Sequence, residues 1–139
     1  MSKTSAEAFI EQLKQNNIRH IEDVQPNGSH FVAVELAGKS NVMYSIAMIF
    51  SPDSQEYGIR CYKLGKVPKE RRQLMLEKLN DLNANYAWVR FFLDSDDDVA
   101  AALDAIVTPE SAAHVCWEML RCFFVILDEL QETIDTVLK

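Results

Sequence analysis

The sequence predicts one α+β domain over residues 1–139, with an antiparallel sheet of about five strands and the element order α-β-β-β-α-β-β-α. Three observations lead to this prediction. Apolar residues recur at helical spacing near both ends of the chain, segments of alternating polarity lie between them, and the turns joining those segments are too short for the crossovers of a parallel sheet. The chain has the length of a single domain and shows no internal repeat.

Residues 5–16 form the first expected helix. Thr4 or Ser5 is the expected N-cap, because a hydroxyl oxygen accepts a hydrogen bond from the first free N–H groups of a helix. The apolar positions of this helix are Ala8, Phe9, Ile10 and Leu13, and they alternate with charged and amide residues.

Three strands then follow as an antiparallel meander. Asn27-Gly28 supplies the positive φ angles of a hairpin turn, and segments of alternating polarity occupy residues 30–36, 42–50 and 57–64. The segment 42–50 carries apolar residues on both faces, so we expect it at the centre of the sheet.

A second helix is expected from Pro68 to Asn83, because proline fits the first turn of a helix. An aromatic strand over residues 85–93 follows it. Residues 99–107 are ambiguous: their alanines favour a helix, whereas their position directly after a hairpin turn favours a strand.

Thr108-Pro109-Glu110 marks the start of a last helix that runs nearly to Lys139. Apolar residues at alternating spacings of four and three give this helix a stripe that is wider than a coiled-coil seam, which favours packing on a sheet. The stripe contains Cys116, Leu120, Phe123, Leu127, Leu130, Ile134 and Val137.

The charge balance limits the classes of partner. The formal net charge is −7 and the pI about 4.9, a balance that repels nucleic acid and anionic membranes, so we expect neither as a partner. Cys61, Cys116 and Cys122 lack C-x-x-C spacing and are interpreted as free thiols in a reducing cytosol. The charged N-terminal segment does not resemble a signal peptide, so we expect a cytoplasmic protein.

No motif marks a catalytic centre. The sequence contains no nucleophile signature such as G-x-S-x-G and no glycine-rich phosphate loop, and Cys116 falls on the apolar stripe of the last helix. We therefore expect no catalytic residue, no metal and no cofactor, and a protein that is not an enzyme.

The acidic cluster Asp94–Asp98 invites comparison with a calcium loop. Counting from Asp94, an EF-hand loop needs glycine at the sixth position and glutamate at the twelfth, where this chain has Val99 and Ala105. We interpret the cluster as the tip of a hairpin, because aspartate tolerates turn geometry.

A basic segment extends from Arg60 to Arg72 and contains six of the fourteen basic residues. Cations at a helix N-terminus oppose the helix dipole, so the segment does not serve stability, and a solvated charge run is the favoured interpretation. The alternative function is a small-molecule or anion sensor that uses residues 60–72. Its anion-binding residues would be Lys63, Lys66, Lys69, Arg71 and Arg72.

The aromatic strand carries the composition of a contact surface. Alternation places Val89, Phe91 and Leu93 on one face, which leaves Trp88, Arg90 and Phe92 together on the other. Tryptophan and arginine are enriched at the energetic centres of protein interfaces. Burial of both faces within the monomer is an equally acceptable interpretation.

Residues 79–107 resemble the YbjN family of bacterial proteins, in which a helix ends in an L-N-x-L-N run and an aromatic-basic-aromatic strand, an acidic turn and a second strand follow. The matching positions are Leu79, Asn80, Leu82, Asn83, Trp88, Arg90, Phe91 and Asp94 to Val99. The family's turn usually contains a glycine after the acids, where this chain has Asp97-Asp98, so the turn type stays open.

The resemblance implies a fold similar to the type III secretion chaperones, which are small, acidic, homodimeric α+β proteins that hold segments of client proteins. It also implies a strand over 99–107. The expected function is a non-enzymatic interaction module, chaperone-like or regulatory, that forms a homodimer and binds an unidentified protein client through a sheet or helix face. The expected contact residues are Trp88, Arg90 and Phe92, with Met75 and Leu79 of the preceding helix as secondary candidates.

Overall fold

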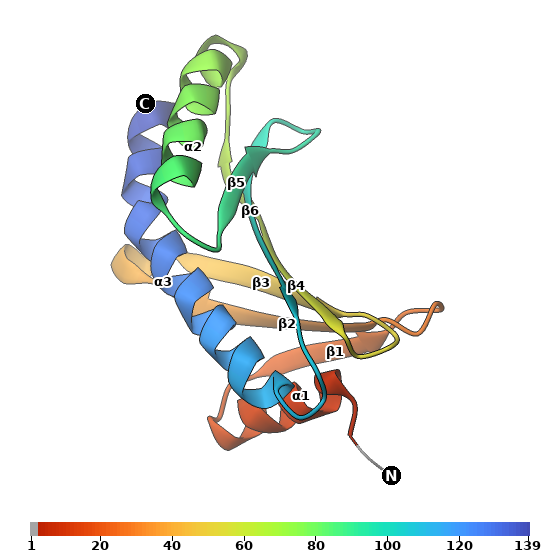
Figure 1. The fold of residues 1–139 in the computed structure, drawn as a ribbon. Helices are drawn as coiled ribbons and strands as arrows, with labels where there is room; N and C mark the ends of the chain where they lie inside the picture. The colour runs from red at the N-terminus through yellow and green to blue at the C-terminus, as the bar shows by residue number, and fades with distance from the viewer. Residues whose placement is uncertain (1–2) are drawn as a thin grey trace.

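A computed structural model describes residues 3–139 as an α+β fold with three α-helices and a six-stranded antiparallel sheet (Figure 1). The helices are α1 (Ser5–Gln15), α2 (Arg72–Asn85) and α3 (Ala112–Leu138). The strands are β1 (His20–Val24), β2 (His30–Ala37), β3 (Met43–Phe50), β4 (Glu56–Lys66), β5 (Arg90–Leu93) and β6 (Asp98–Ile106). Short 3₁₀ turns occupy Lys39–Asn41 and Lys69–Arg71.

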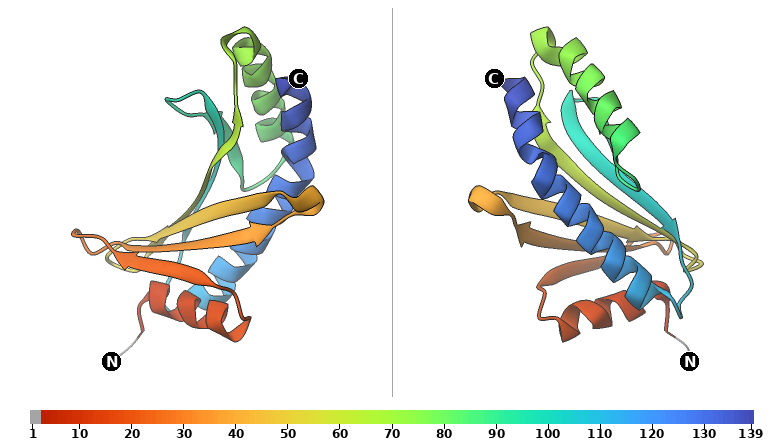
Figure 2. Two further views of the ribbon diagram at one scale, coloured as in Figure 1. Left: turned by 180° about the vertical axis from the view of Figure 1, so that it is seen from behind. Right: turned by 60° about the vertical axis from the view of Figure 1, so that its left-hand side comes forward.

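The strands pair in the spatial order β1-β2-β3-β4-β6-β5, and all three helices cover one face of the twisted sheet (Figure 2). Helix α3 crosses that face and packs against β4 and β6, with α1 near β2 at one end and α2 beside β5 at the other. The core lies between the sheet and these helices, and Phe9, Ile46, Met48 and Phe123 are completely buried in it.

The N-cap of α1 is Thr4, one of the two predicted candidates. Its hydroxyl oxygen accepts a hydrogen bond from the Glu7 N–H at 3.1 Å, and the Glu7 carboxylate accepts one from the Thr4 N–H at 2.9 Å. This reciprocal arrangement satisfies two donors at the helix start. Ser5 is buried instead, and its hydroxyl donates to the Ser54 carbonyl, which ties α1 to the β3–β4 turn.

Strand β1 is the sixth strand, which the sequence did not predict. Its residues, HIEDV, are exposed or half-buried throughout, because β1 is an edge strand that no helix covers. Such a strand needs no apolar alternation, so the sequence pattern carries no signal for it. The predicted turn that joins it to β2 does form, with Gly28 at a φ of 91° and Asn27 in an ordinary conformation.

Strand β3 lies at the centre of the sheet, as predicted, but only one of its faces is covered. Tyr44, Ile46, Met48 and Phe50 are buried, whereas Met43 and Ile49 on the opposite face are 58% and 43% exposed. We call this second side of the sheet, which α1, α2 and α3 leave uncovered, the open face. The apolar residues of the open face are therefore exposed in the monomer and do not form a second core layer.

The predicted strand over 85–93 is shorter than expected. Helix α2 continues to Asn85, and β5 begins only at Arg90. Residues 98–106 do form the strand β6 that the family resemblance implied. The last helix begins at Ala112, with Ser111 as its N-cap, and Thr108 closes the preceding turn by accepting the Ser111 N–H at 3.1 Å.

A stability prediction arises where the β2–β3 turn meets α3. The Asp128 carboxylate accepts hydrogen bonds from the Lys39 N–H at 3.1 Å and from the Tyr44 hydroxyl at 3.2 Å, close beside Gly38. A Cβ at Gly38 would overlap that carboxylate and approach the Tyr44 ring to 2.6 Å. We expect Gly38→Ala to lower the free energy of unfolding by about 1–3 kcal/mol, measured by urea denaturation.

Gly65→Ala is the matched control for this prediction. A Cβ at Gly65 would approach Leu138 Cδ1 to 2.7 Å, but Leu138 ends α3 and can move aside. We expect a loss of less than about 1 kcal/mol. A loss in Gly38→Ala below about 1 kcal/mol would mean that the side chains of Asp128 and Tyr44 move aside without cost.

Candidate functional site

Trp88 sits in a strained backbone conformation just before β5. Its φ is 73°, and the Val89 N–H donates to the Ala87 carbonyl at 2.8 Å, which makes Trp88 the centre of a γ-turn with positive φ. A bulky residue in this region costs of order 1–3 kcal/mol, and such strain clusters at functional sites. The Trp88 side chain is 68% exposed, so burial of the ring does not compensate for the strain.

The predicted alternation holds from Val89 to Phe92, but Trp88 does not lie on the face that carries Arg90 and Phe92. Val89 and Phe91 are buried at 3% and 2% exposure, while Arg90 is exposed and Phe92 half-buried on the open face. The γ-turn separates Trp88 from the regular strand, so Trp88 lies near Arg90 without sharing the pleat of β5.

Because β5 begins only at Arg90, part of β6 has no neighbouring strand on that side. Strand β5 pairs with Val99–Ala102 only, so no described strand lies opposite residues Leu103–Ile106 on that side. The Val107 N–H donates to the Gln55 carbonyl at 2.9 Å, so Gln55 and Val107 form a hydrogen-bonded pair at the end of the β4–β6 ladder. Since bonded and non-bonded pairs alternate in antiparallel sheets, the backbone N–H and C=O groups of Asp104 and Ile106 point away from β4.

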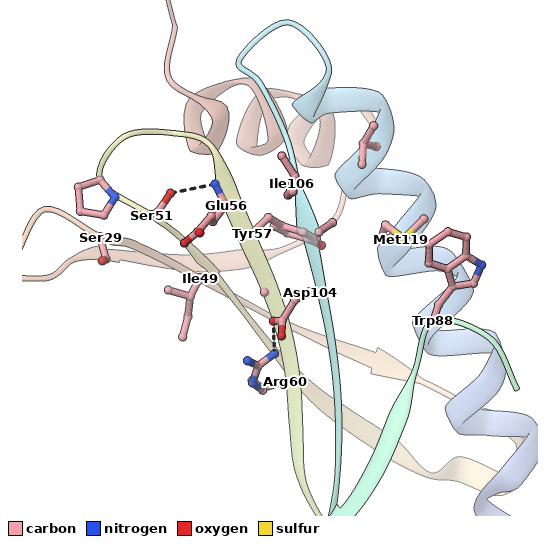
Figure 3. A pocket seen from close by; sticks show the side chains of 14 residues that line it. Ser29, Ile49, Ser51, Glu56, Tyr57, Arg60, Trp88, Asp104, Ile106 and Met119 are labelled. Atoms are coloured by element: carbon pink, nitrogen blue, oxygen red, sulfur yellow. Dashed lines mark hydrogen bonds and ion pairs between the residues drawn. The ribbon is translucent and has the colours of Figure 1, made fainter. Parts of the chain in front are cut away.

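A hollow of about 1020 Å³ surrounds this free edge, which we call the β6 hollow (Figure 3). Trp88 and Met119 flank the edge on the α3 side, and Ile49, Arg60 and Asp104 line the open face beside it. Ile106, at the end of the edge, is 87% exposed. An exposed tryptophan and isoleucine on either side of free backbone groups are features of a binding surface.

Charged side chains meet at the centre of the open face. The Asp104 carboxylate accepts from Arg60 Nη1 at 2.7 Å and from Arg90 Nη2 at 3.0 Å. Partial burial alone would raise the pKa of Asp104, but the hydrogen bonds and charges of the two arginines outweigh it and hold that pKa below its ordinary value. Two guanidinium groups share one carboxylate, so this cluster carries one uncompensated positive charge.

Asp104 and Ile106 are site residues that the sequence prediction missed, and Arg60 entered it only as the start of the basic segment 60–72. Asp104 is the only charged residue in residues 99–107, so it could have marked the outward face of that strand. Its partners could not have been found, because Arg60 lies across a strand pair whose register only the fold defines.

Met75 and Leu79, the secondary contact candidates, lie in the core. They are 0% and 2% exposed and form the inner stripe of α2 together with Leu82. An apolar stripe on a helix has the same sequence pattern whether it faces the protein's own sheet or a partner. In this structure neither side chain offers surface to a partner.

The acidic turn and the basic segment lie against each other. Asp94 closes the turn by accepting the Asp96 and Asp98 N–H groups at 2.9 and 3.1 Å, and Asp97 adopts a φ of 58°. Lys66 donates to the Asp96 carbonyl, and Arg72 Nε lies 3.3 Å from Asp97 Oδ1. Two of the five proposed anion-binding residues are therefore already paired, which leaves Lys63, Lys69 and Arg71.

Cys61 and Cys116 are not activated thiols. Burial raises the pKa of the Cys61 thiol to about 12 and raises that of Cys116 as well. Both stay protonated at neutral pH and are poor nucleophiles. All three cysteines are free, as predicted.

Residues 3–139 contain neither a candidate metal-ion cluster nor a helix that could cross a membrane. No three His, Cys, Asp or Glu side chains are grouped closely enough there to hold a metal ion. None of the described helices combines the length and apolar character needed to span a bilayer.

The strain at Trp88 leads to a prediction about the order of two variants. Alanine is normally more stable than glycine at a given site, by about 0.4–1 kcal/mol. At positive φ an L-residue costs about 1–2 kcal/mol that glycine avoids. We therefore expect the free energy of unfolding of Trp88→Gly to exceed that of Trp88→Ala by about 0.5–1 kcal/mol, measured by urea denaturation. The usual order, alanine above glycine, would show that the γ-turn relaxes when the ring is removed.

Comparisons with known proteins agree on fold and family. The YbjN family model, described as "Putative bacterial sensory transduction regulator", matches residues 6–136. No curated protein matches the sequence.

Two solved structures resemble this one at identities that show the fold alone. The first is Escherichia coli YbjN, described as "a putative transcription regulator", with 15% identity, a TM-score of 0.58 and 92% of each chain covered. The second is the Yersinia pestis type III secretion chaperone SycH in complex with a stable fragment of YscM2. It has 13% identity and a TM-score of 0.56, covering 91% of this chain and 99% of that one.

Proposed function

The chain belongs to the YbjN family, and from that premise we propose that it is a non-enzymatic interaction module, chaperone-like or regulatory, that binds a protein partner through the open face and the β6 hollow. The observation that carries the proposal is the exposure of Trp88 at 68%, held in a strained γ-turn beside the free edge of β6. The folded domain alone gains no stability from such an arrangement. A partner that covers the ring would gain binding free energy from its burial.

The position of the arginines supports the same surface. The Arg90 side chain is 52% exposed and lies on the open face with the half-buried Phe92. Arginine is among the residues enriched at the energetic centres of interfaces. SycH, which has a similar fold, was solved in complex with a protein fragment.

We place this module in the cytoplasm and expect it to form a homodimer. Free cysteines suit a reducing compartment. A second copy could cover part of the open face, whose Met43, Ile49 and Ile106 are exposed in the monomer. Sedimentation at tens of micromolar, roughly the scale of a moderate interface, tests this: a dimer mass is expected, and a compact monomer would count against it.

Affinity capture from the native host tests the binding function. The wild-type protein should retain a partner that Trp88→Ala does not retain. Leu74→Ala is the matched control, because Leu74 is an exposed apolar residue on the outer side of α2, away from the open face and outside the residues that line the β6 hollow. Identical partners on all three proteins would place the contact surface elsewhere.

The alternative function, a small-molecule or anion sensor at residues 60–72, has less support. The acidic turn already pairs with Lys66 and Arg72, so an anion would have to displace Asp97 or use Lys63, Lys69 and Arg71 alone.

A further inference from the structure

We propose that the free edge of β6 at Asp104–Ile106 receives an extended segment of a partner protein as an added β-strand, and that an acidic side chain of this segment faces Arg60 and Arg90. The inference rests on the proposed function and specifies the kind of partner and its mode of binding. Strand addition supplies backbone hydrogen bonds for affinity and alternating side-chain positions for specificity.

The first argument is that the two outer edges of the sheet, along β5 and β1, are protected. Along β5, the Asn83 side chain accepts the Phe91 N–H at 2.7 Å and donates to the Phe91 carbonyl at 2.9 Å, so it occupies the place of a further strand. Along β1, Glu22 and Asp23 place charges at the edge, which is a common protection against pairing. The edge at Asp104–Ile106 has neither protection, although its backbone groups point outward.

The second argument concerns the walls of the β6 hollow. Successive side chains of an added strand would point to opposite sides of the sheet. On the helix side they would meet Trp88, Val115 and Met119, which favour apolar residues. On the open face they would meet Arg60 and Asp104. The expected segment therefore alternates apolar and polar residues.

Charge decides which polar residue fits best. Arg60 and Arg90 share the single carboxylate of Asp104, and an acidic side chain from the segment would compensate the remaining positive charge. Glu56 lies across from Ile106 on the neighbouring strand, so the acidic preference applies at the Asp104 end of the edge only.

The geometry favours a segment over a second copy of this chain. Trp88 and α3 flank the edge, so a single strand can enter beside β6. Two copies that joined these edges would have to accommodate both Trp88 turns and both α3 helices at the junction.

Selection from a display library of random nine-residue peptides tests the proposal. The library is selected on the wild-type protein, and the enriched peptides are measured on Ile106→Pro and Ile106→Ala. Proline removes the outward N–H without touching the β4 ladder, and alanine removes the same exposed side chain but keeps that N–H. We expect enriched peptides that alternate apolar and polar residues and contain an acid. They should bind Ile106→Pro about tenfold more weakly and Ile106→Ala within about threefold.

Amide hydrogen exchange on the wild-type complex supplies a readout that does not depend on either variant. The bound peptide should protect the N–H groups of Asp104 and Ile106 and leave those of Glu22 and Val24 on β1 unchanged. Failure to enrich any peptide, equal affinity for both Ile106 variants, or protection of β1 instead would each overturn strand addition. Protection of Asp104 and Ile106 that rises with protein concentration and needs no peptide would also overturn it, in favour of a second copy.

Failure here is distinguishable from failure of the proposed function. If no peptide binds but Trp88→Ala still loses the captured partner, the interaction surface stands and the partner docks as a folded domain. If Trp88→Ala and wild type capture the same partners, the proposed function itself is wrong.

Discussion

Trp88→Ala should weaken the complex with the captured partner by about 30-fold or more, the effect of losing an interface residue worth about 2 kcal/mol. Trp88 is 68% exposed in the free protein and lines the β6 hollow together with Ile106 and Met119, so a partner that fills the hollow must cover the indole ring. Titration calorimetry with the purified partner would measure the loss.

The same substitution should leave the fold intact. We expect the free energy of unfolding to change by less than about 1 kcal/mol, because the ring has few neighbours to lose. Leu74→Ala, on the outer side of α2, should leave the affinity within about twofold of wild type. If Trp88→Ala loses affinity and stability together, the ring supports the β5 turn and its effect on binding is indirect.

Phe9→Ala should have the largest effect on stability. Phe9 is completely buried, and its ring centroid lies 5.8 Å from that of Phe50 and 6.2 Å from that of Tyr57. It joins α1 to the sheet, so its removal leaves a cavity between two elements that other contacts hold in place. We expect the free energy of unfolding to fall by about 3–5 kcal/mol in urea denaturation.

Leu74→Ala is the control for this core substitution. Leu74 lies on the outer side of α2 and is 47% exposed, so its truncation should cost less than about 1 kcal/mol. A loss of that small size in Phe9→Ala would mean that α1 is attached loosely and that the sheet and α3 fold without it.

Local patterns were sufficient for most of the elements. The capping pair Thr4–Glu7, the turn at Gly28 and the stripe of α3 follow from interactions between residues that are close in sequence. The outward placement of Arg90 and Phe92 follows from the two-residue period of a strand, which needs only one buried neighbour to set its phase.

Other features needed the fold because their causes are distant in sequence. Met75 and Leu79 form the same stripe whether a sheet or a partner covers it, and only the packing of α2 shows that they are core. Strand β1 has no apolar pattern and exists because β2 offers it a partner edge. Lys66 and Arg72 lie next to acidic residues because the turn of the β5–β6 hairpin packs against them.

The sequence by itself determined the α+β class, the family resemblance and the outward-facing residues of the aromatic strand, because each depends on periodicity or on a contiguous run of residues. The tertiary structure alone decided the candidate site. The γ-turn at Trp88 precedes β5, which begins only at Arg90, and the register between β4 and β6 brings Arg60 to Asp104 and turns the backbone of Asp104 and Ile106 outward. Strand register is set by pairing across the whole sheet, and no local stretch of this chain encodes it.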